Sequence, residues 1–163
     1  MAGWGGKRKG AGRKVSPDAG APHVPRPKIS GRFPVYLSVP VSDELPLRNK
    51  RASGVIQAAV DLGKDRFGFR LNRFSIDGNE LHLLAEAPDS DALARGMQGL
   101  LVRLARGLNR LAARKGRVFV DRYRVRILKT AAELADALGG MAAGEPALGI
   151  TPRSALLQSI AKR

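Results

Sequence analysis

The sequence predicts an α+β domain with the ferredoxin-like βαββαβ plan, an antiparallel sheet with helices on one face, followed by a C-terminal helix. Three observations support this fold class. Segments with alternating apolar residues flank two segments whose apolar residues recur at helical spacing. A Gly-Asn pair separates the two central strand candidates, as in a tight hairpin. The order of the segments along the chain matches that plan.

The first half of the domain supplies a strand, a helix and a hairpin. Alternating or helically spaced apolar residues predict the bounds of these four elements: a strand at 34–41, a helix at about 49–67, and strands at 69–78 and 80–86. Gly68 provides a C-terminal stop for the helix, because glycine readily adopts the left-handed conformation found there. The turn between the last two strands falls at 77–79.

The second half repeats the pattern and adds a helix. Asp89 is an N-cap residue for a long helix over 91–114. Residues 117–128 alternate as a fourth strand. Thr130 and Glu133 have the spacing of a capping box and start a third helix within 131–143. We expect the glycine pair 139–140 to end that helix.

Composition divides the chain into three parts. Residues 1–32 predict a disordered basic arm rich in glycine and proline, 33–143 a folded domain, and 144–163 a linker with a short C-terminal helix. The chain has no cysteine, which excludes disulfides and thiolate metal sites. It has no apolar run that would span a bilayer and no signal peptide. We therefore expect a cytoplasmic protein.

The formal net charge of +15 is concentrated in two places. Residues 1–32 carry eight Lys/Arg against one Asp, and 89–130 carry eleven against three; the other stretches balance. Such clustering predicts a polyanionic partner, most simply nucleic acid. A solvated basic surface is the alternative interpretation.

The long helix concentrates its arginines within an arc of roughly 100° at 3.6 residues per turn. Asp91 is the only acid in that helix, so intrahelical ion pairs do not explain the stripe. The predicted nucleic-acid-binding residues come from the arm, this helix and the fourth strand: Lys7, Arg8, Lys9, Arg13, Lys14, Arg95, Arg103, Arg106, Arg110, Arg114, Arg122, Arg124 and Arg126. The arm fits either a narrow minor groove or non-specific phosphate contacts.

Three ordered stretches carry a family resemblance: RFGFRLNRFSIDGNELHLLAEA, ALARGMQGLLVRLARGLNRL and GRVFVDRYRVRILKT. In these, the chain resembles the REP-associated tyrosine transposases, single-strand DNA transposases of the His-hydrophobic-His superfamily. The resemblance runs from about Pro34 to Thr130 and makes 33–143 a transposase-like domain. It implies a bacterial protein that binds hairpin or single-stranded DNA. It also implies cleavage and rejoining through a phosphotyrosine link, assisted by a divalent ion.

Two positions depart from the family pattern. The first histidine of the motif is Glu80, while His82 is retained. Glu80 and His82 are thus the predicted metal ligands, for Mg²⁺ or Mn²⁺, since a carboxylate suits hard cations. The family's nucleophilic tyrosine would fall near Gly140, yet the third helix contains no tyrosine. The resemblance therefore predicts a degenerate copy that binds DNA with lost or reduced catalysis.

Other interpretations stay open at this stage. Tyr123 is a candidate nucleophile, or a partner subunit supplies that residue, which would make the protein an active transposase. A homodimer is compatible with either. Glu80 and His82 are equally compatible with a polar strand face that binds no ligand. A third alternative is an RNA-binding protein with an RRM-like sheet, although the RNP aromatic consensus is absent.

Overall fold

The computed structural model describes residues 25–45 and 47–143. The arm residues Lys7, Arg8, Lys9, Arg13 and Lys14 lie outside the described residues. So does the predicted C-terminal linker and helix at 144–163.

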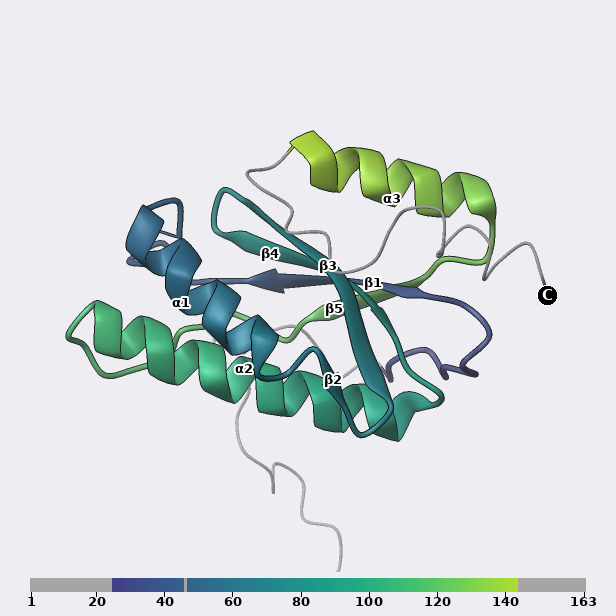
Figure 1. The fold of residues 1–163 in the computed structure, drawn as a ribbon, viewed down its shortest axis with the longest axis horizontal. Coiled ribbons are helices and arrows are strands. Elements are labelled where there is room, and N and C mark those ends of the chain that lie inside the picture. Colours follow the sequence, from purple (N-terminus) through teal and green to yellow (C-terminus); the bar gives the residue numbers. More distant parts are fainter. Residues whose placement is uncertain (1–24, 46, 144–163) are drawn as a thin grey trace, which may run out of the picture.

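Five antiparallel strands form one sheet in the order β2-β3-β4-β1-β5 (Figure 1). The elements along the chain are β1 (Val35–Pro40), α1 (Lys50–Asp61), β2 (Asp65–Arg66), β3 (Phe69–Asp77), β4 (Glu80–Glu86), α2 (Ser90–Leu111), β5 (Arg124–Ile127) and α3 (Ala131–Ala143). Without the two-residue β2, this is the predicted βαββαβ plan with a further helix. The predicted α+β, ferredoxin-like fold class is confirmed.

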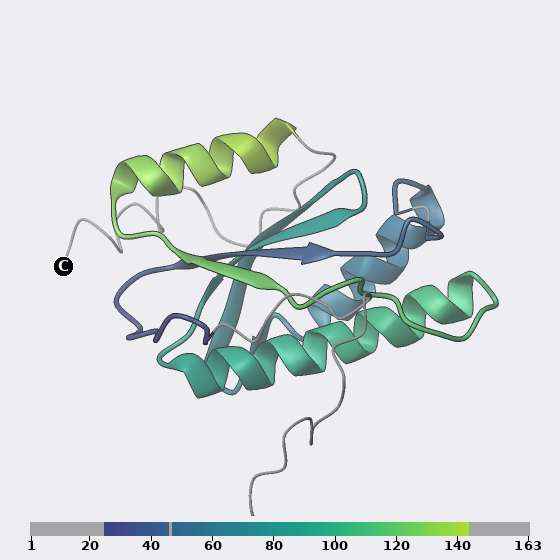
Figure 2. The same ribbon diagram turned by 180° about the vertical axis from the view of Figure 1, so that it is seen from behind.

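The sheet lies between two unequal helical layers. Helices α1 and α2 cover one face, as the fold class predicts, and α3 lies across the opposite face (Figures 1 and 2). Alternation along each strand decides which side chains meet which layer. On β1, Val35, Leu37 and Val39 are buried toward α1 and α2, whereas Tyr36 packs on the cluster beneath α3.

Two of the three described helices have the N-terminal caps that the sequence predicts. The Asp89 carboxylate accepts a hydrogen bond from the amide of Ala92 at 2.7 Å. At α3, the Glu133 amide donates to the Thr130 hydroxyl at 3.1 Å, and the Thr130 amide donates to the Glu133 carboxylate at 3.0 Å. These reciprocal bonds satisfy amide groups that the first helical turn leaves without partners.

Four predicted boundaries are wrong. Helix α2 ends at Leu111 rather than 114. Helix α1 ends at Asp61 rather than 67, because Phe67 and Gly68 both have positive φ and make the turn of a small β2–β3 hairpin. The fourth strand shortens to Arg124–Ile127, although Phe119 still bridges Val41. Helix α3 continues through the glycine pair 139–140. The burial of α3's apolar side chains outweighs a glycine cost of about 1 kcal/mol per residue.

Candidate nucleic-acid interface

The predicted arginine stripe lies along the exposed side of α2. Arg95, Arg106 and Arg110 are exposed and Arg103 is half-buried. Three of the five predicted residues border a groove between α1 and α2 with a volume of about 530 Å³. The groove is lined by Val55, Ala58, Ala59, Leu62, Arg103, Arg106, Gly107, Arg110 and Leu111.

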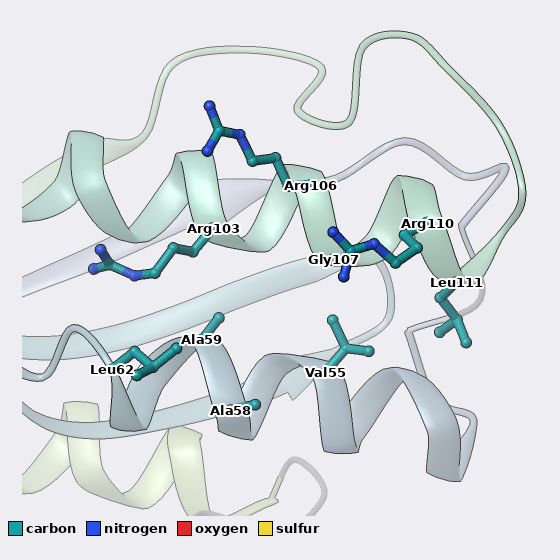
Figure 3. Close-up of a pocket in the computed structure, with 9 residues that line it drawn as sticks. All are labelled: Val55, Ala58, Ala59, Leu62, Arg103, Arg106, Gly107, Arg110 and Leu111. Atoms are coloured by element: carbon teal, nitrogen blue, oxygen red, sulfur yellow. The ribbon is translucent and has the colours of Figure 1, made fainter.

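The groove combines an apolar wall on α1 with a cationic wall on α2 (Figure 3). Arg103 and Arg110 extend along it, while Arg106 points outward from α2. Burial, and then the nearby charge of Arg66, lowers the pKa of Arg103 from its usual value. Its Nε atom is buried without a hydrogen-bond partner. The cationic wall therefore concentrates positive charge that forms no ion pair among residues 25–45 and 47–143.

Three carboxylates within the described residues form ion pairs, all with cations outside α2. The ion pairs there join Arg48 to Asp77, Lys64 to Asp61, and Arg114 to Glu44. Arg114 lies beyond the C-terminal end of α2 and also donates to the carbonyl of Arg117. The arginines within α2 have no carboxylate partner in this part of the chain.

The β5 arginines form a separate surface. Arg124 pairs with Ser38 and Arg126 with Tyr36 across the β1–β5 ladder, which places both arginines on the α3 face of the sheet. The Arg126 guanidinium lies over the Tyr36 ring at 5.1 Å. Arg122 is exposed and borders a different hollow, beside α2, so it lies on the α2 side of the sheet and apart from Arg124 and Arg126.

Glu80 and His82 lie on the same face of β4, as strand alternation predicts. His82 has a partner that the sequence did not reveal. Its Nδ1 shares a 2.8 Å hydrogen bond with the Tyr36 hydroxyl, and the two rings stack 5.7 Å apart at 18°. Burial raises the pKa of Tyr36, with smaller raising effects from Glu80 and Asp77 and a lowering effect from Arg126.

A divalent ion would find few ligands on this face. Within the described residues, no three His, Cys, Asp or Glu side chains gather in a way that would hold a metal ion. Glu80 and His82 provide two donors, and Nδ1 of His82 already has a hydrogen-bond partner. Mg²⁺ and Mn²⁺ favour about six ligands, mostly oxygens. These residues alone therefore do not complete a coordination sphere.

Tyr123 lies on the other side of the sheet. It is only 9% exposed and belongs to the core cluster beneath α1 and α2. The guanidinium of Arg26 lies 3.8 Å from its ring centroid. Burial raises the pKa of its hydroxyl, and the charge of Arg26 acts in the opposite direction. The structure therefore brings Tyr36, not Tyr123, to His82.

The chain was compared with protein-family models, with curated proteins and with solved structures. No protein-family model matches the chain, and no curated protein matches its sequence. Among solved structures, it is similar to a REP-associated tyrosine transposase bound to a REP hairpin, with a TM-score of 0.54 and 13% identity. That similarity covers 72% of this chain and 68% of the other.

A second similar structure is a candidate transposase from Deinococcus radiodurans R1, with a TM-score of 0.49 and 14% identity over 75% of this chain and 95% of that one. The first similarity defines a transposase-like fold. The resemblance to the REP-associated tyrosine transposases is thereby confirmed as structural similarity. In the described part of the chain, no helix is both long and apolar enough to cross a bilayer.

Proposed function

We propose that this chain is a DNA-binding protein of transposase-like fold that recognises hairpin or single-stranded DNA. The observation that carries the proposal is the cationic wall of α2, whose arginines have no carboxylate partner among the described residues. Guanidinium groups bind phosphates in bidentate geometry and remain charged at every physiological pH. The basic arm, with Lys7, Arg8, Lys9, Arg13 and Lys14, would add phosphate contacts.

The choice of DNA rests on the fold and the charge together. The similar REP-associated tyrosine transposase was solved bound to a REP hairpin. This chain has the same type of fold and a net charge of +15. We therefore infer hairpin or single-stranded DNA as the partner, met in the bacterial cytoplasm.

Strand cleavage is lost or reduced in this proposal. Helix α3, which would carry the nucleophile, contains no tyrosine, and its Gly140 is exposed with no side chain or backbone atom within 4 Å of a Cβ built there. Glu80 and His82 remain the proposed ligands of Mg²⁺ or Mn²⁺. Because they provide two donors, we expect weak metal binding that depends on phosphate and water oxygens to complete the shell.

Salt-dependent binding tests the proposal. The affinity for a single-stranded oligonucleotide with a hairpin should fall linearly on a log–log plot against salt. The double variant Arg106→Gln/Arg110→Gln should reduce the slope by about 1.4–1.8, since each lost phosphate contact contributes about 0.7 on a single strand and about 0.9 on the duplex stem. The matched control, Arg48→Gln/Lys64→Gln, removes the same charge from residues that already have carboxylate partners. Its slope should stay that of the unmodified protein.

Two results would contradict the proposal. Salt-insensitive or absent binding to every oligonucleotide would remove the electrostatic role of α2. Preferential competition by an RNA hairpin over a DNA hairpin of the same sequence would favour the RNA-binding alternative.

A further inference from the structure

A small polar hollow on the α3 face of the sheet lies apart from the α2 groove. It has a volume of about 370 Å³ and is lined by Tyr36, Ser38, Arg124 and Arg126. The register explains the grouping: Ser38 lies opposite Arg124 and Tyr36 opposite Arg126 on neighbouring strands. Residues two apart on one strand share a face, so both guanidinium groups border the same hollow.

The two arginines of this hollow lack an ion-pair partner in the part of the chain that the structure describes. No ion pair within the described residues includes Arg124 or Arg126, and no acid lines the hollow. The Glu133 carboxylate exerts a charge interaction with Arg126 but is already bonded to the amides of Lys129 and Thr130. Glu80 lies opposite Pro40, further along the strands than Ser38. Positive charge therefore dominates the site.

The ring of Tyr36 restrains the side chain of Arg126. Its guanidinium lies over the Tyr36 ring, and that ring is fixed by stacking on His82 and by the 2.8 Å hydrogen bond to Nδ1. A cation placed over an aromatic face is attracted to it, and a fixed ring limits the positions the cation samples. Tyr36 and His82 thus act as positioning residues for the arginine.

We propose that this hollow is a phosphate-binding cradle for the end of a DNA strand, an inference that rests on the proposed DNA-binding function. Arg124 and Arg126 would donate charge-assisted hydrogen bonds to the phosphate oxygens, and the Ser38 hydroxyl would add a third donor. Two guanidinium groups match a dianionic terminal phosphate better than a monoanionic internal diester. The site therefore favours a phosphorylated strand end.

The position of the cradle connects it to the α2 groove. β5 is an edge strand of the sheet, so a single strand can pass around that edge from one face to the other. Arg122 borders a hollow on the α2 side immediately before β5. A hairpin on α2 with a single-stranded extension reaching the cradle would use both surfaces.

The test compares two oligonucleotides that differ only in their ends. Each has a hairpin and a single-stranded extension, which carries either a terminal phosphate or a hydroxyl, and both 5′ and 3′ ends are examined. The protein should prefer the phosphorylated oligonucleotide by about tenfold at one of the two ends, the size expected for two charge-assisted bonds. Arg124→Gln/Arg126→Gln should reduce this preference to about one while hairpin binding persists.

The matched control is Arg106→Gln/Arg110→Gln, which should weaken both oligonucleotides equally and leave the preference intact. Circular dichroism establishes that each variant is folded. Equal affinity for phosphorylated and hydroxylated ends in the unmodified protein would overturn the cradle and leave the proposed DNA binding standing. If no DNA binds at all, the proposed function fails. In that case a ³¹P NMR titration with inorganic phosphate tests the cradle separately. Phosphate binding by the unmodified protein that is lost in Arg124→Gln/Arg126→Gln would support the cradle, and the absence of phosphate binding would overturn it.

Discussion

The two faces of the sheet differ in how completely they are covered. Helices α1 and α2 close one face over a large apolar cluster, whereas α3 buries six residues on the other: Leu84, Leu128, Leu134, Ala137, Leu138 and Met141. The first face determines the fold. The second is left partly polar: Tyr36, Ser38, Arg124 and Arg126 line a hollow there, and Tyr36 is hydrogen-bonded to His82.

Glycines show the same contrast at atomic scale. A Cβ at Gly96 on α2 would lie 2.2 Å from Cγ of Phe69. At Gly107 it would lie 2.5 Å from a methyl of Val55 on α1. Added Cβ atoms at Gly139 and Gly140 on α3 would meet nothing within 4 Å. Helix α2 is packed at van der Waals contact, while the exposed side of α3 faces open space.

The largest loss of stability should come from a substitution in the core between the sheet and helices α1 and α2. Leu100→Ala removes a side chain that is 0% exposed, so it should lower the free energy of unfolding by about 2–5 kcal/mol through lost burial and a residual cavity. Leu111→Ala on the same helix is the control, because Leu111 is 37% exposed and should cost no more than about 1 kcal/mol. Urea denaturation measures both. Equal losses would contradict the contrast between core and surface of α2.

The glycines provide the second test. Gly96→Ala should destabilise by about 1–3 kcal/mol, because the new methyl group would lie 2.2 Å from Cγ of Phe69, a side chain that is itself fully buried. Gly140→Ala should instead stabilise by up to about 1 kcal/mol, since alanine favours the helix and meets no neighbour. Thermal unfolding of the two variants should therefore shift in opposite directions. A stabilising Gly96→Ala would show that α2 packs more loosely than its contacts indicate.

Most of the fold follows from periodicity that the sequence displays. Alternation in β1, β3 and β4, helical spacing in α2, and the cap at Asp89 depend on residues close together in the chain, so they were predicted to within a few residues. The failures have tertiary causes. Arg66 sits in a two-residue strand with no alternation to detect, and Phe67 resembles a continuation of α1 until its positive φ is known.

The candidate site was less predictable because it depends on register. The sequence shows Glu80 beside His82 and arginines along α2, since each set lies on one element. The Tyr36–His82 contact requires β1 to pair with β4 such that Ser38 lies opposite His82. The position of Tyr123 in the core requires the path of 117–123 across α2. Neither fact is encoded in local spacing.

On the partly open face, Tyr36→Phe should have a moderate effect. It removes one hydrogen bond and leaves Nδ1 of His82 without its partner, which should cost about 0.5–1.5 kcal/mol of stability. The ring stays under Arg126, so the preference for phosphorylated DNA ends should persist. Tyr36→Ala removes the ring as well and should weaken that preference. An unchanged preference in Tyr36→Ala would remove the positioning role of the ring.

The smallest expected effect concerns covalent attachment to DNA: we expect no protein–DNA adduct, and therefore no change when a tyrosine is replaced. Incubation of the protein with hairpin-bearing single-stranded DNA and Mn²⁺ should give no protein–DNA band that survives SDS. Each tyrosine has its own physical reason. Tyr123 is buried beneath α2 with Arg26 over its ring, on the face opposite His82, and α3 has no tyrosine. Tyr36 does contact His82, but burial raises the pKa of its hydroxyl and so disfavours the phenolate that would attack. Tyr123→Phe and Tyr36→Phe should then match the unmodified protein.

The same assay distinguishes the alternatives if a band does appear, with an active REP-associated tyrosine transposase as positive control. Loss of the band in Tyr123→Phe would establish Tyr123 as the nucleophile, despite its burial. Loss in Tyr36→Phe would instead assign the attack to the hydroxyl beside His82, on the face whose incomplete coverage leaves it within reach of the β5 arginines. A band unaffected by either substitution requires a nucleophile other than tyrosine, because the chain contains only these two tyrosines.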